Sequence, residues 1–143
     1  MTTRRQLLQG AALVGAAPLL PRPAYAAGTG NIFVSLEKGN EVVVLDRTYA
    51  QIKRIATSKR PRDMHFNQDR TQLFVACGDD DAIDIIDVNT LEVVDSVVTG
   101  PSPEVFAFSP DYKTIWVSNE EYSQLEAIDL ESRVSIAQIP TGA

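Results

Sequence analysis

Cysteine and histidine are almost missing from this sequence of 143 residues, which holds one of each, Cys77 and His65. A single cysteine cannot form a disulfide within the chain. No Cys-x-x-Cys-His run is present, so the sequence encodes no covalently attached c-type haem. We therefore expect Cys77 to be a buried, unreactive thiol, and we expect neither a cofactor nor a metal site.

No apolar run in the sequence has the roughly 20 residues that a membrane span needs. The longest run, residues 11–20, follows Arg4-Arg5 and precedes Ala24-Tyr25-Ala26, whose Ala24 and Ala26 give the small-x-small pattern of a signal peptidase site. We interpret residues 1–26 as an export signal and predict a periplasmic protein. Paired arginines before a moderately apolar run are typical of twin-arginine signals, with an ordinary secretory signal as the alternative.

Basic residues are scarcer than acidic ones, 13 against 19. Residues 1–26 contain three of the arginines and no acid, so residues 27–143 carry 10 basic and 19 acidic residues, a net charge of −9. Such a surface repels nucleic acid and anionic lipid. We expect no nucleic-acid partner and, once the signal is removed, no membrane span.

One pattern occurs in three copies along the rest of the sequence. The pairs Phe33-Val34, Phe74-Val75 and Trp116-Val117 are each followed, 13 positions after the aromatic residue, by Asp46, Asp87 and Asp129. Thr57, Thr99 and Thr141 close the copies at intervals of 42, but the first two aspartates lie 41 apart. One residue is therefore missing between Asp46 and Thr57, in a hairpin connection where length changes are tolerated.

Each copy is built from short segments that are rich in β-branched and aromatic residues and bounded by Asn, Asp or Gly. The second copy has four, at residues 63–66, 72–77, 82–87 and 92–98. Four strands in about forty residues are typical of one propeller blade. The other copies supply residues 31–36, 41–46 and 51–56, and residues 104–109, 114–118, 125–130 and 134–139.

The sequence thus predicts an all-β fold, a β-propeller of four-stranded antiparallel blades. Residues 27–143 would form blades at about 31–56, 62–99 and 104–141, the first without its innermost strand. Propellers usually have four to eight blades, so we interpret the sequence as the N-terminal part of a longer chain. Residues 27–143 alone would leave apolar faces and strand edges uncovered, and we expect them to fold poorly or to associate.

Trp116-Val117-Ser118-Asn119, with Phe33-Val34-Ser35 and Phe74-Val75-Ala76 in register, resembles the tyrosine-valine-threonine-asparagine (YVTN) repeat of bacterial β-propellers. The resemblance covers residues 27–143 and implies a ring of seven blades. Residues 59–62, 76–77 and 100–104 are most similar to the periplasmic branch associated with alcohol catabolism that depends on pyrroloquinoline quinone (PQQ). That branch implies a non-enzymatic accessory protein that binds a periplasmic protein or a small metabolite.

The same resemblance brings no catalytic motif and does not imply PQQ binding. Quinoprotein dehydrogenases hold PQQ in eight tryptophan-docked blades, whereas this sequence has one tryptophan, Trp116, which we place in a strand core. His65 falls on the innermost strand of its blade, where a histidine can act as a general base or a haem ligand. A lactonase-like hydrolase and a d-type haem redox propeller therefore stay open as alternatives, although a hydrogen-bonded histidine wedged between blades is favoured.

Loops on one rim of the propeller gather most of the candidate binding residues. The residues that we expect there are Lys59, Arg60, Arg62, Asp79, Asp80, Asp81, Glu104 and Glu120. Three consecutive aspartates suit calcium poorly, so we expect residues 79–81 to form a solvated turn. Charges of both signs beside prolines suit recognition of a polar partner, with ordinary solvated loops as the alternative. Lys59, Arg60 and Arg62 are predicted to form an isolated positive patch that attracts an acidic partner or an anionic metabolite.

Overall fold

A computed structural model of the chain describes residues 29–142. The predicted export signal, residues 1–26 with its cleavage site at Ala24 and Ala26, lies outside the described residues. Eleven strands and one short 3-10 helix are present in the described part: β1 (Ile32–Leu36), η1 (Glu37–Gly39), β2 (Glu41–Leu45), β3 (Gln51–Ala56), β4 (Pro61–Phe66), β5 (Gln72–Cys77), β6 (Ala82–Asp87), β7 (Glu92–Val98), β8 (Pro103–Phe108), β9 (Thr114–Asn119), β10 (Gln124–Asp129) and β11 (Val134–Pro140). No helix within residues 29–142 has the length and apolar character to span a membrane.

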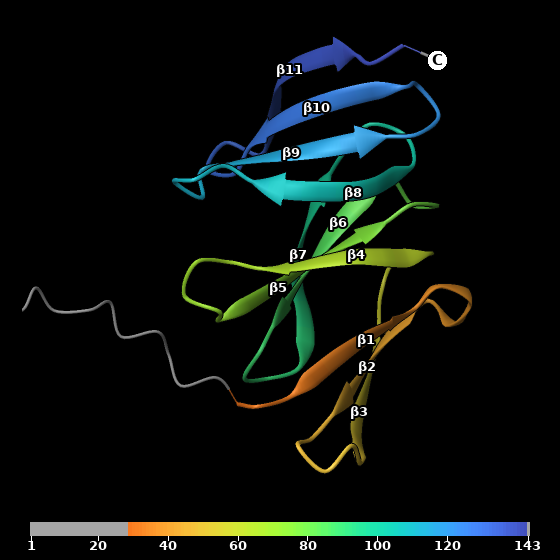
Figure 1. Cartoon of the computed structure of the whole chain (residues 1–143), viewed down its shortest axis with the longest axis vertical. Helices are drawn as coiled ribbons and strands as arrows, with labels where there is room; N and C mark the ends of the chain where they lie inside the picture. Colours follow the sequence, from red (N-terminus) through yellow and green to blue (C-terminus); the bar gives the residue numbers. More distant parts are fainter. Residues whose placement is uncertain (1–28, 143) are drawn as a thin grey trace, which may run out of the picture.

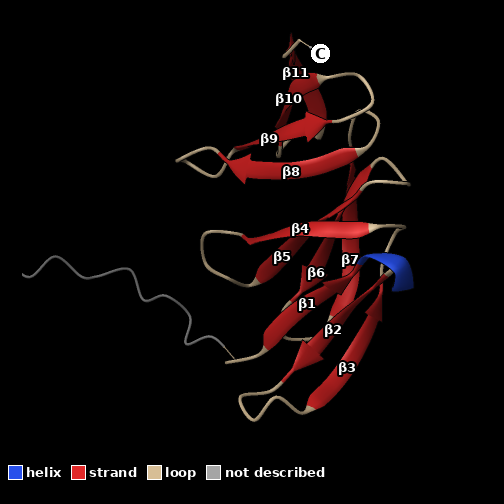
Figure 2. Ribbon diagram, turned by 45° about the vertical axis from the view of Figure 1, so that its right-hand side comes forward, coloured by secondary structure: helices blue, strands red, loops and turns tan. Residues whose placement is uncertain are grey.

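The strands form three antiparallel sheets that stack one on the next (Figures 1 and 2). Sheet A contains β1 to β3, sheet B contains β4 to β7, and sheet C contains β8 to β11, and in each sheet the strands pair in chain order. Each segment predicted as a strand coincides with one, with ends that differ by at most two residues. The propeller architecture is confirmed, and sheet A has no strand equivalent to β4 and β8.

Two apolar layers hold the stack together. Between sheets A and B, Val42, Val44 and Ile55 pack with Leu73, Val75 and Ile86, all buried. Between sheets B and C, Phe74, Ile83, Ile85 and Val97 pack with Phe106, Ile115, Val117 and Ile128. Because successive residues of a strand point to opposite faces, β5 and β6 feed both layers and are apolar nearly throughout. Each buried side chain contributes about 1.5–3 kcal/mol.

The same hairpin occurs once in each sheet. It joins β2 to β3, β6 to β7 and β10 to β11. In each pairing a β-bulge shifts the register by one residue, which leaves Ile52, Val94 and Ile136 without a partner on the opposite strand. Tyr49, Leu91 and Arg133 close the three turns with positive φ. Tyr49 follows Asp46 by three residues, whereas Leu91 and Arg133 follow Asp87 and Asp129 by four. The missing residue therefore lies in the turn between β2 and β3.

The predicted core position of Trp116 is wrong. Its side chain is 37% exposed, whereas Phe74, the equivalent residue of sheet B, is 4% exposed. Both point to the same side of their sheets, but sheet C covers Phe74, and no sheet within residues 29–142 covers Trp116. The sequence pattern identified the correct face of the strand but not what lies over it.

Candidate functional site

Two linkers between the sheets form the base of the candidate site. Residues 57–60 lead from β3 into β4, and residues 99–102 lead from β7 into β8. In each case a buried carboxylate in the middle of the next sheet accepts a hydrogen bond from the linker backbone: Asp84 from the Ser58 N–H at 2.7 Å, and Glu126 from the Gly100 N–H at 2.7 Å. The two carboxylates are 42 residues apart, as are their donors, so the contact repeats with the blades.

A second pair of contacts fixes the end of each linker. Asn40 Oδ1 accepts a hydrogen bond from the Arg60 N–H at 3.0 Å, and Asp81 Oδ1 accepts one from the Ser102 N–H at 2.9 Å. Arg60 and Ser102 have left-handed backbones, with φ of 59° and 56°, a conformation that costs energy outside glycine. The flanking hydrogen bonds hold it, and they thereby fix where the Arg60 side chain begins.

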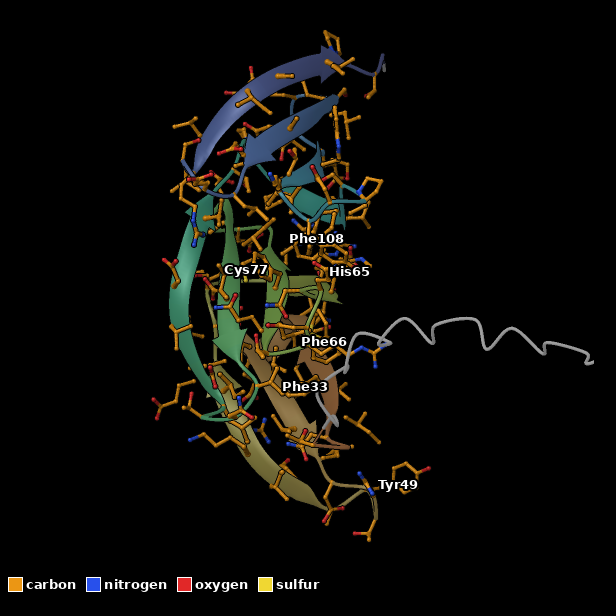
Figure 3. The ribbon with its side chains drawn as sticks, turned by 90° about the vertical axis from the view of Figure 1, so that its left-hand side faces the viewer. Phe33, Tyr49, His65, Phe66, Cys77 and Phe108 are labelled. Carbon is orange, nitrogen blue, oxygen red and sulfur yellow. The ribbon has the colours of Figure 1, made fainter. Side chains whose placement is uncertain are left out.

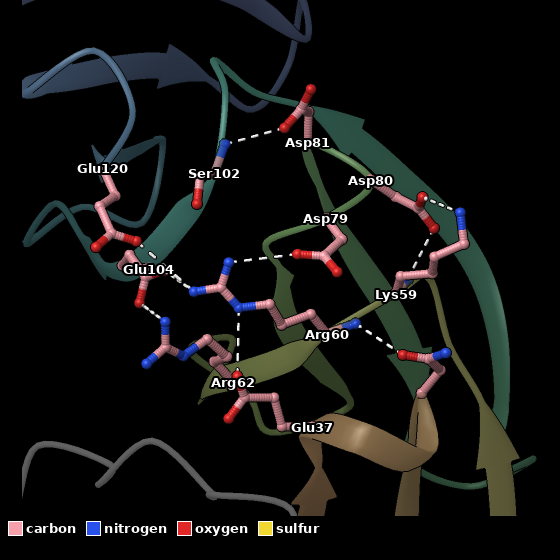
Figure 4. A network of polar contacts seen from close by, with 11 residues as sticks. Glu37, Lys59, Arg60, Arg62, Asp79, Asp80, Asp81, Ser102, Glu104 and Glu120 are labelled. Atoms are coloured by element: carbon pink, nitrogen blue, oxygen red, sulfur yellow. Dashed lines mark hydrogen bonds and ion pairs between the residues drawn. The ribbon is translucent and has the colours of Figure 1, made fainter.

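The Arg60 guanidinium lies among carboxylates from all three sheets (Figure 4). Its Nε lies 3.3 Å from Glu37 Oε1, its Nη1 lies 3.3 Å from Asp79 Oδ1, and its Nη2 lies 2.6 Å from Glu104 Oε1 and 3.6 Å from Glu120 Oε2. The hydrogen bond to Asp79, with the nearby charge of Glu104, raises the pKa of Arg60 despite its partial burial. This arginine therefore stays charged and links the three sheets.

The other two predicted cations are also paired. Arg62 pairs with Glu104, and Lys59 Nζ lies 3.1 Å from Asp80 Oδ1. The Lys59 N–H donates to Asp80 Oδ2 at 2.7 Å, and this bond with the ammonium contact lowers the pKa of Asp80. All eight predicted rim residues thus lie on one face, which we call the junction rim and define as those eight residues plus Glu37.

One sequence-based interpretation of the junction rim is wrong. Lys59, Arg60 and Arg62 are not an isolated positive patch, because each is paired with a carboxylate and the rim holds six carboxylates against three cations. Residues 79–81 form an exposed turn, as expected, and all three of their side chains also bond to linker residues. The partners lie 19 to 60 residues apart in the sequence, so the local cluster of cations gave no sign of them.

His65 lies at the edge of sheet B next to sheet C. Its Nε2 is 3.1 Å from Asp63 Oδ2, which also accepts a hydrogen bond from the Phe106 N–H at 3.0 Å, and its ring meets the Phe106 ring edge to face at 5.0 Å. Figure 3 shows His65, Phe66 and Phe108 on the side of the stack opposite β7. This geometry agrees with the predicted hydrogen bond and with contact across two blades, but the His65 side chain is 46% exposed and is not enclosed between them.

A reactive cysteine and a metal site are two further kinds of chemical site that residues 29–142 could hold. Cys77 is fully buried, and burial raises the pKa of its thiol to about 12, which confirms the expected unreactive cysteine. Within residues 29–142, no three or more His, Cys, Asp or Glu side chains are grouped as a metal site would require. The arrangement on the junction rim is suited to binding, since its charged groups are fixed in place before any partner arrives.

The sequence of the chain matches the model of a known family. The family model of the YNCE-like beta-propeller matches residues 6–130. The chain belongs to this family. No curated protein matches it.

Solved structures share the fold of this YNCE-like beta-propeller. Hydrazine synthase from Kuenenia stuttgartiensis matches with a TM-score of 0.68 and 21% identity, over 76% of this chain and 32% of that one. A functionally unknown protein from Desulfotomaculum acetoxidans DSM 771 matches at 0.63 and 20%, over 78% and 38%. Apo AztD from Citrobacter koseri matches at 0.63 and 17%, over 81% and 33%. The chain thus spans about a third of the length of these structures, and the similarity concerns the fold alone.

Sequence reasoning missed Glu37, Asn40 and the buried pair Asp84 and Glu126. A signal for the pair was available, because an acidic residue inside an apolar strand is buried only with partners. Asn40 and Asp81 also stand at equivalent positions of the 41-residue interval, which could have marked both as linker contacts. Glu37 in η1 has no comparable signal, since sheets B and C contain no such helix.

Proposed function

We propose that this YNCE-like beta-propeller is an exported, non-enzymatic binding protein of the periplasm. In this proposal it is part of a ring of seven blades and assists quinoprotein-dependent alcohol oxidation by binding a partner protein or a small metabolite. The observation that supports the proposal is the junction rim, where loops, strand ends and η1 hold nine charged side chains on one face. A surface ordered in advance loses little entropy when it binds, which favours recognition.

The charges of the rim favour a partner with basic groups. The two arginines are partly covered, with Arg60 27% and Arg62 35% exposed, whereas Lys59 is 64% exposed. Three of the carboxylates are also exposed, with Glu37 at 52%, Asp79 at 55% and Glu120 at 64%. An approaching molecule therefore meets more carboxylates than cations, on a surface with three more carboxylates than cations. This replaces the acidic partner expected from the sequence. Complementary charge would act mainly on the association rate and would weaken with salt.

Export and the link to alcohol oxidation are supported by sequence features. Residues 1–26 have the order of charged, apolar and small residues that a signal peptide has, and residues 59–62 and 100–104 resemble the PQQ-associated branch. No residue of this chain is assigned to PQQ itself. The proposal concerns a protein that accompanies the dehydrogenase.

The test is binding between the purified protein and an exported quinoprotein alcohol dehydrogenase, measured by biolayer interferometry at low and high salt. Replacing Asp79 and Glu120 by Lys should weaken binding about tenfold or more at low salt, mostly through slower association. Glu131→Lys is the matched control, because Glu131 is an exposed acid in the turn between β10 and β11, at the other end of sheet C. No binding by the parent, or equal loss in the control, would contradict the proposal; turnover of a lactone or a haem absorbance band would favour the enzymatic or redox alternatives.

A further inference from the structure

The inner strand β4 carries a polar pair, Asp63 and His65, on the face that meets sheet C. Successive residues of β4 point to opposite faces, so Met64 packs in the layer between sheets A and B while His65 meets Phe106 of sheet C. The pair therefore lies at a junction whose two sheets are both present in residues 29–142. His65 is nevertheless 46% exposed, on the inner side of the stack opposite β7 (Figure 3), where a propeller has its central channel.

This polar pair is not part of the blade repeat. The residues 42 positions later, on β8, are Val105 and Ala107, so an inner strand of this fold needs no titratable side chain at these two positions. Asp63 and His65 also belong to neither of the two apolar layers between the sheets. A departure from the local pattern that packing does not explain is expected at functional residues.

Hydrogen bonds determine which atoms of the pair are free to bind a ligand. Asp63 Oδ2 accepts the Phe106 N–H at 3.0 Å and lies 3.1 Å from His65 Nε2. A carboxylate only accepts, so Nε2 carries the proton and the neutral ring has its lone pair on Nδ1. Neither His65 Nδ1 nor Asp63 Oδ1 takes part in a hydrogen bond within residues 29–142. The pair thus offers two acceptor atoms, on an imidazole that the carboxylate holds in one orientation.

Aromatic rings of sheet C adjoin the pair. The ring centroid of Phe106 lies 5.0 Å from that of His65 and 6.0 Å from that of Phe108. The Tyr112 ring follows, 5.1 Å from Phe108. Phe106 is buried and Phe108 half-buried, but Tyr112 is 38% exposed. Apolar rings beside a few oriented polar atoms are typical of sites that bind small molecules.

We infer that Asp63 and His65 bind a small neutral molecule that carries a hydroxyl group on a ring or another apolar body. The hydroxyl donates to His65 Nδ1, and the body lies against Phe108 and Tyr112. A hydroxyl both donates and accepts, so it suits the neutral and the protonated imidazole, whereas an ammonium group is repelled by the protonated one. The carboxylate of Asp63 and the net charge of −9 on residues 27–143 oppose an anion. The inference does not depend on the proposed function, because the pair lies outside the junction rim.

Nuclear magnetic resonance on the full 143-residue chain tests this site directly. His65 is the one histidine of the sequence, so the imidazole 15N signals need no assignment. Without ligand these signals should show the Nε2–H tautomer. Benzyl alcohol should shift the Nδ1 signal in a titration that saturates. Benzyl methyl ether has the same ring but no donor and should bind about tenfold more weakly, as loss of one hydrogen bond predicts.

Two variants separate the polar contact from the apolar one, with affinities measured by saturation-transfer difference NMR. His65→Phe keeps a ring but removes the acceptor, so it should weaken binding of the alcohol about tenfold and leave that of the ether unchanged. Tyr112→Leu should weaken binding of both molecules. Tyr49→Leu is the matched control, since Tyr49 is exposed in the turn between β2 and β3, and it should change neither affinity.

Four results would overturn the inference: an Nδ1–H tautomer, no saturable binding of the alcohol, equal affinity of the parent for alcohol and ether, or tighter binding of benzylamine than of benzyl alcohol. Circular dichroism should show unchanged strand content in each variant. If His65→Phe fails to fold, the tautomer and the comparison of the three molecules on the parent chain decide the question without it.

Discussion

The buried carboxylates Asp84 and Glu126 perform the same task with different neighbours. Asp84 accepts a second hydrogen bond, at 3.0 Å, from the hydroxyl of Ser58, the linker residue whose N–H it already holds. Glu126 has glycine at the equivalent linker position and accepts its second bond from the Asn119 amide at 2.8 Å. A Cβ on Gly100 would lie 2.4 Å from the Asn119 nitrogen, so the asparagine requires the glycine. Each carboxylate is thus satisfied, which a buried charge needs.

Glu126 should make the stability of the protein depend on pH. Burial raises its pKa, but hydrogen bonds from the Gly100 N–H and the Asn119 amide outweigh burial and hold the pKa below the ordinary value of 4.5. A carboxyl whose folded pKa is lowered stabilises the fold above its unfolded pKa and loses that contribution as pH falls through the folded pKa. We predict that Glu126→Gln costs about 1–3 kcal/mol at pH 7, as loss of a charged hydrogen-bond acceptor does.

The expected cost shrinks as the pH falls below 4.5, because the parent carboxyl is then protonated too. Urea denaturation of parent and variant at pH 7, 5 and 3.5 measures it. Glu131→Gln, at an exposed position, serves as the control and should change stability little at any pH. A Glu126→Gln cost that stays constant from pH 7 to 3.5 would mean that the charge of Glu126 does not hold the linker.

What the sequence predicts about single residues depends on how far away their partners are. The burial of Cys77 could be predicted because Cys77 ends a short apolar strand, a pattern that is visible in the neighbouring residues alone. The pairing of Arg60 does not, because its four carboxylates come from three sheets and only the fold brings them together. The predicted burial of Trp116 is wrong for a related reason, because a strand residue is buried only where a neighbouring sheet covers it.

At the scale of elements, the middle strands and the outer strands of a sheet differ in their sequence patterns and in their burial. The middle strands β5 and β6 are covered on both faces and give apolar runs, while β7 and β11 lie at the outer edge and are mostly exposed. The bulges at Ile52, Val94 and Ile136 fall where these outer strands pair. A bulge increases local twist, which an edge strand accommodates because little packs on it.

The hairpin between β2 and β3 should accept the residue that it lacks. We predict that inserting one glycine between Thr48 and Tyr49 changes the free energy of unfolding by no more than about 0.5 kcal/mol, as other surface changes do. The same insertion between Val75 and Ala76 should abolish cooperative unfolding, because a slip of one residue turns the side chains of a buried strand to the wrong faces. Urea denaturation compares the two. Equal effects at both sites would show that the turn length is fixed by more than the pairing of its strands.

Strand positions were predictable from the sequence because pattern and burial agree in each copy. The linkers were not, since Ser58 and Gly100 owe their conformation to carboxylates 26 residues later. Val43 stands in sheet A where sheets B and C have Asp84 and Glu126, so the sequence does distinguish the sheet without an inner strand from the two that have one. This difference between the sheets can be recognised in the sequence once the role of the two carboxylates is known.

At the scale of the whole molecule, binding and packing are assigned to different surfaces. The junction rim lies at one end of the strands, where the linkers enter β4 and β8, and its charged side chains are already paired (Figure 4). The apolar layers that hold the stack together lie between the sheets. A partner that binds the junction rim would therefore not need to disturb the packing of the sheets.

The proposed export of the chain, and its route, can be tested through Arg4 and Arg5. A twin-arginine signal needs both arginines, whereas an ordinary secretory signal needs only positive charge before its apolar run. We predict that replacing both by Lys keeps the charge but stops export, and that the parent appears in the periplasm with a mature N-terminus at Ala27. Mass spectrometry of periplasmic and cytoplasmic fractions measures both outcomes. Continued export of the double variant would assign the ordinary secretory route, and a parent that stays in the cytoplasm at full length would remove the basis for placing the junction rim in the periplasm at all.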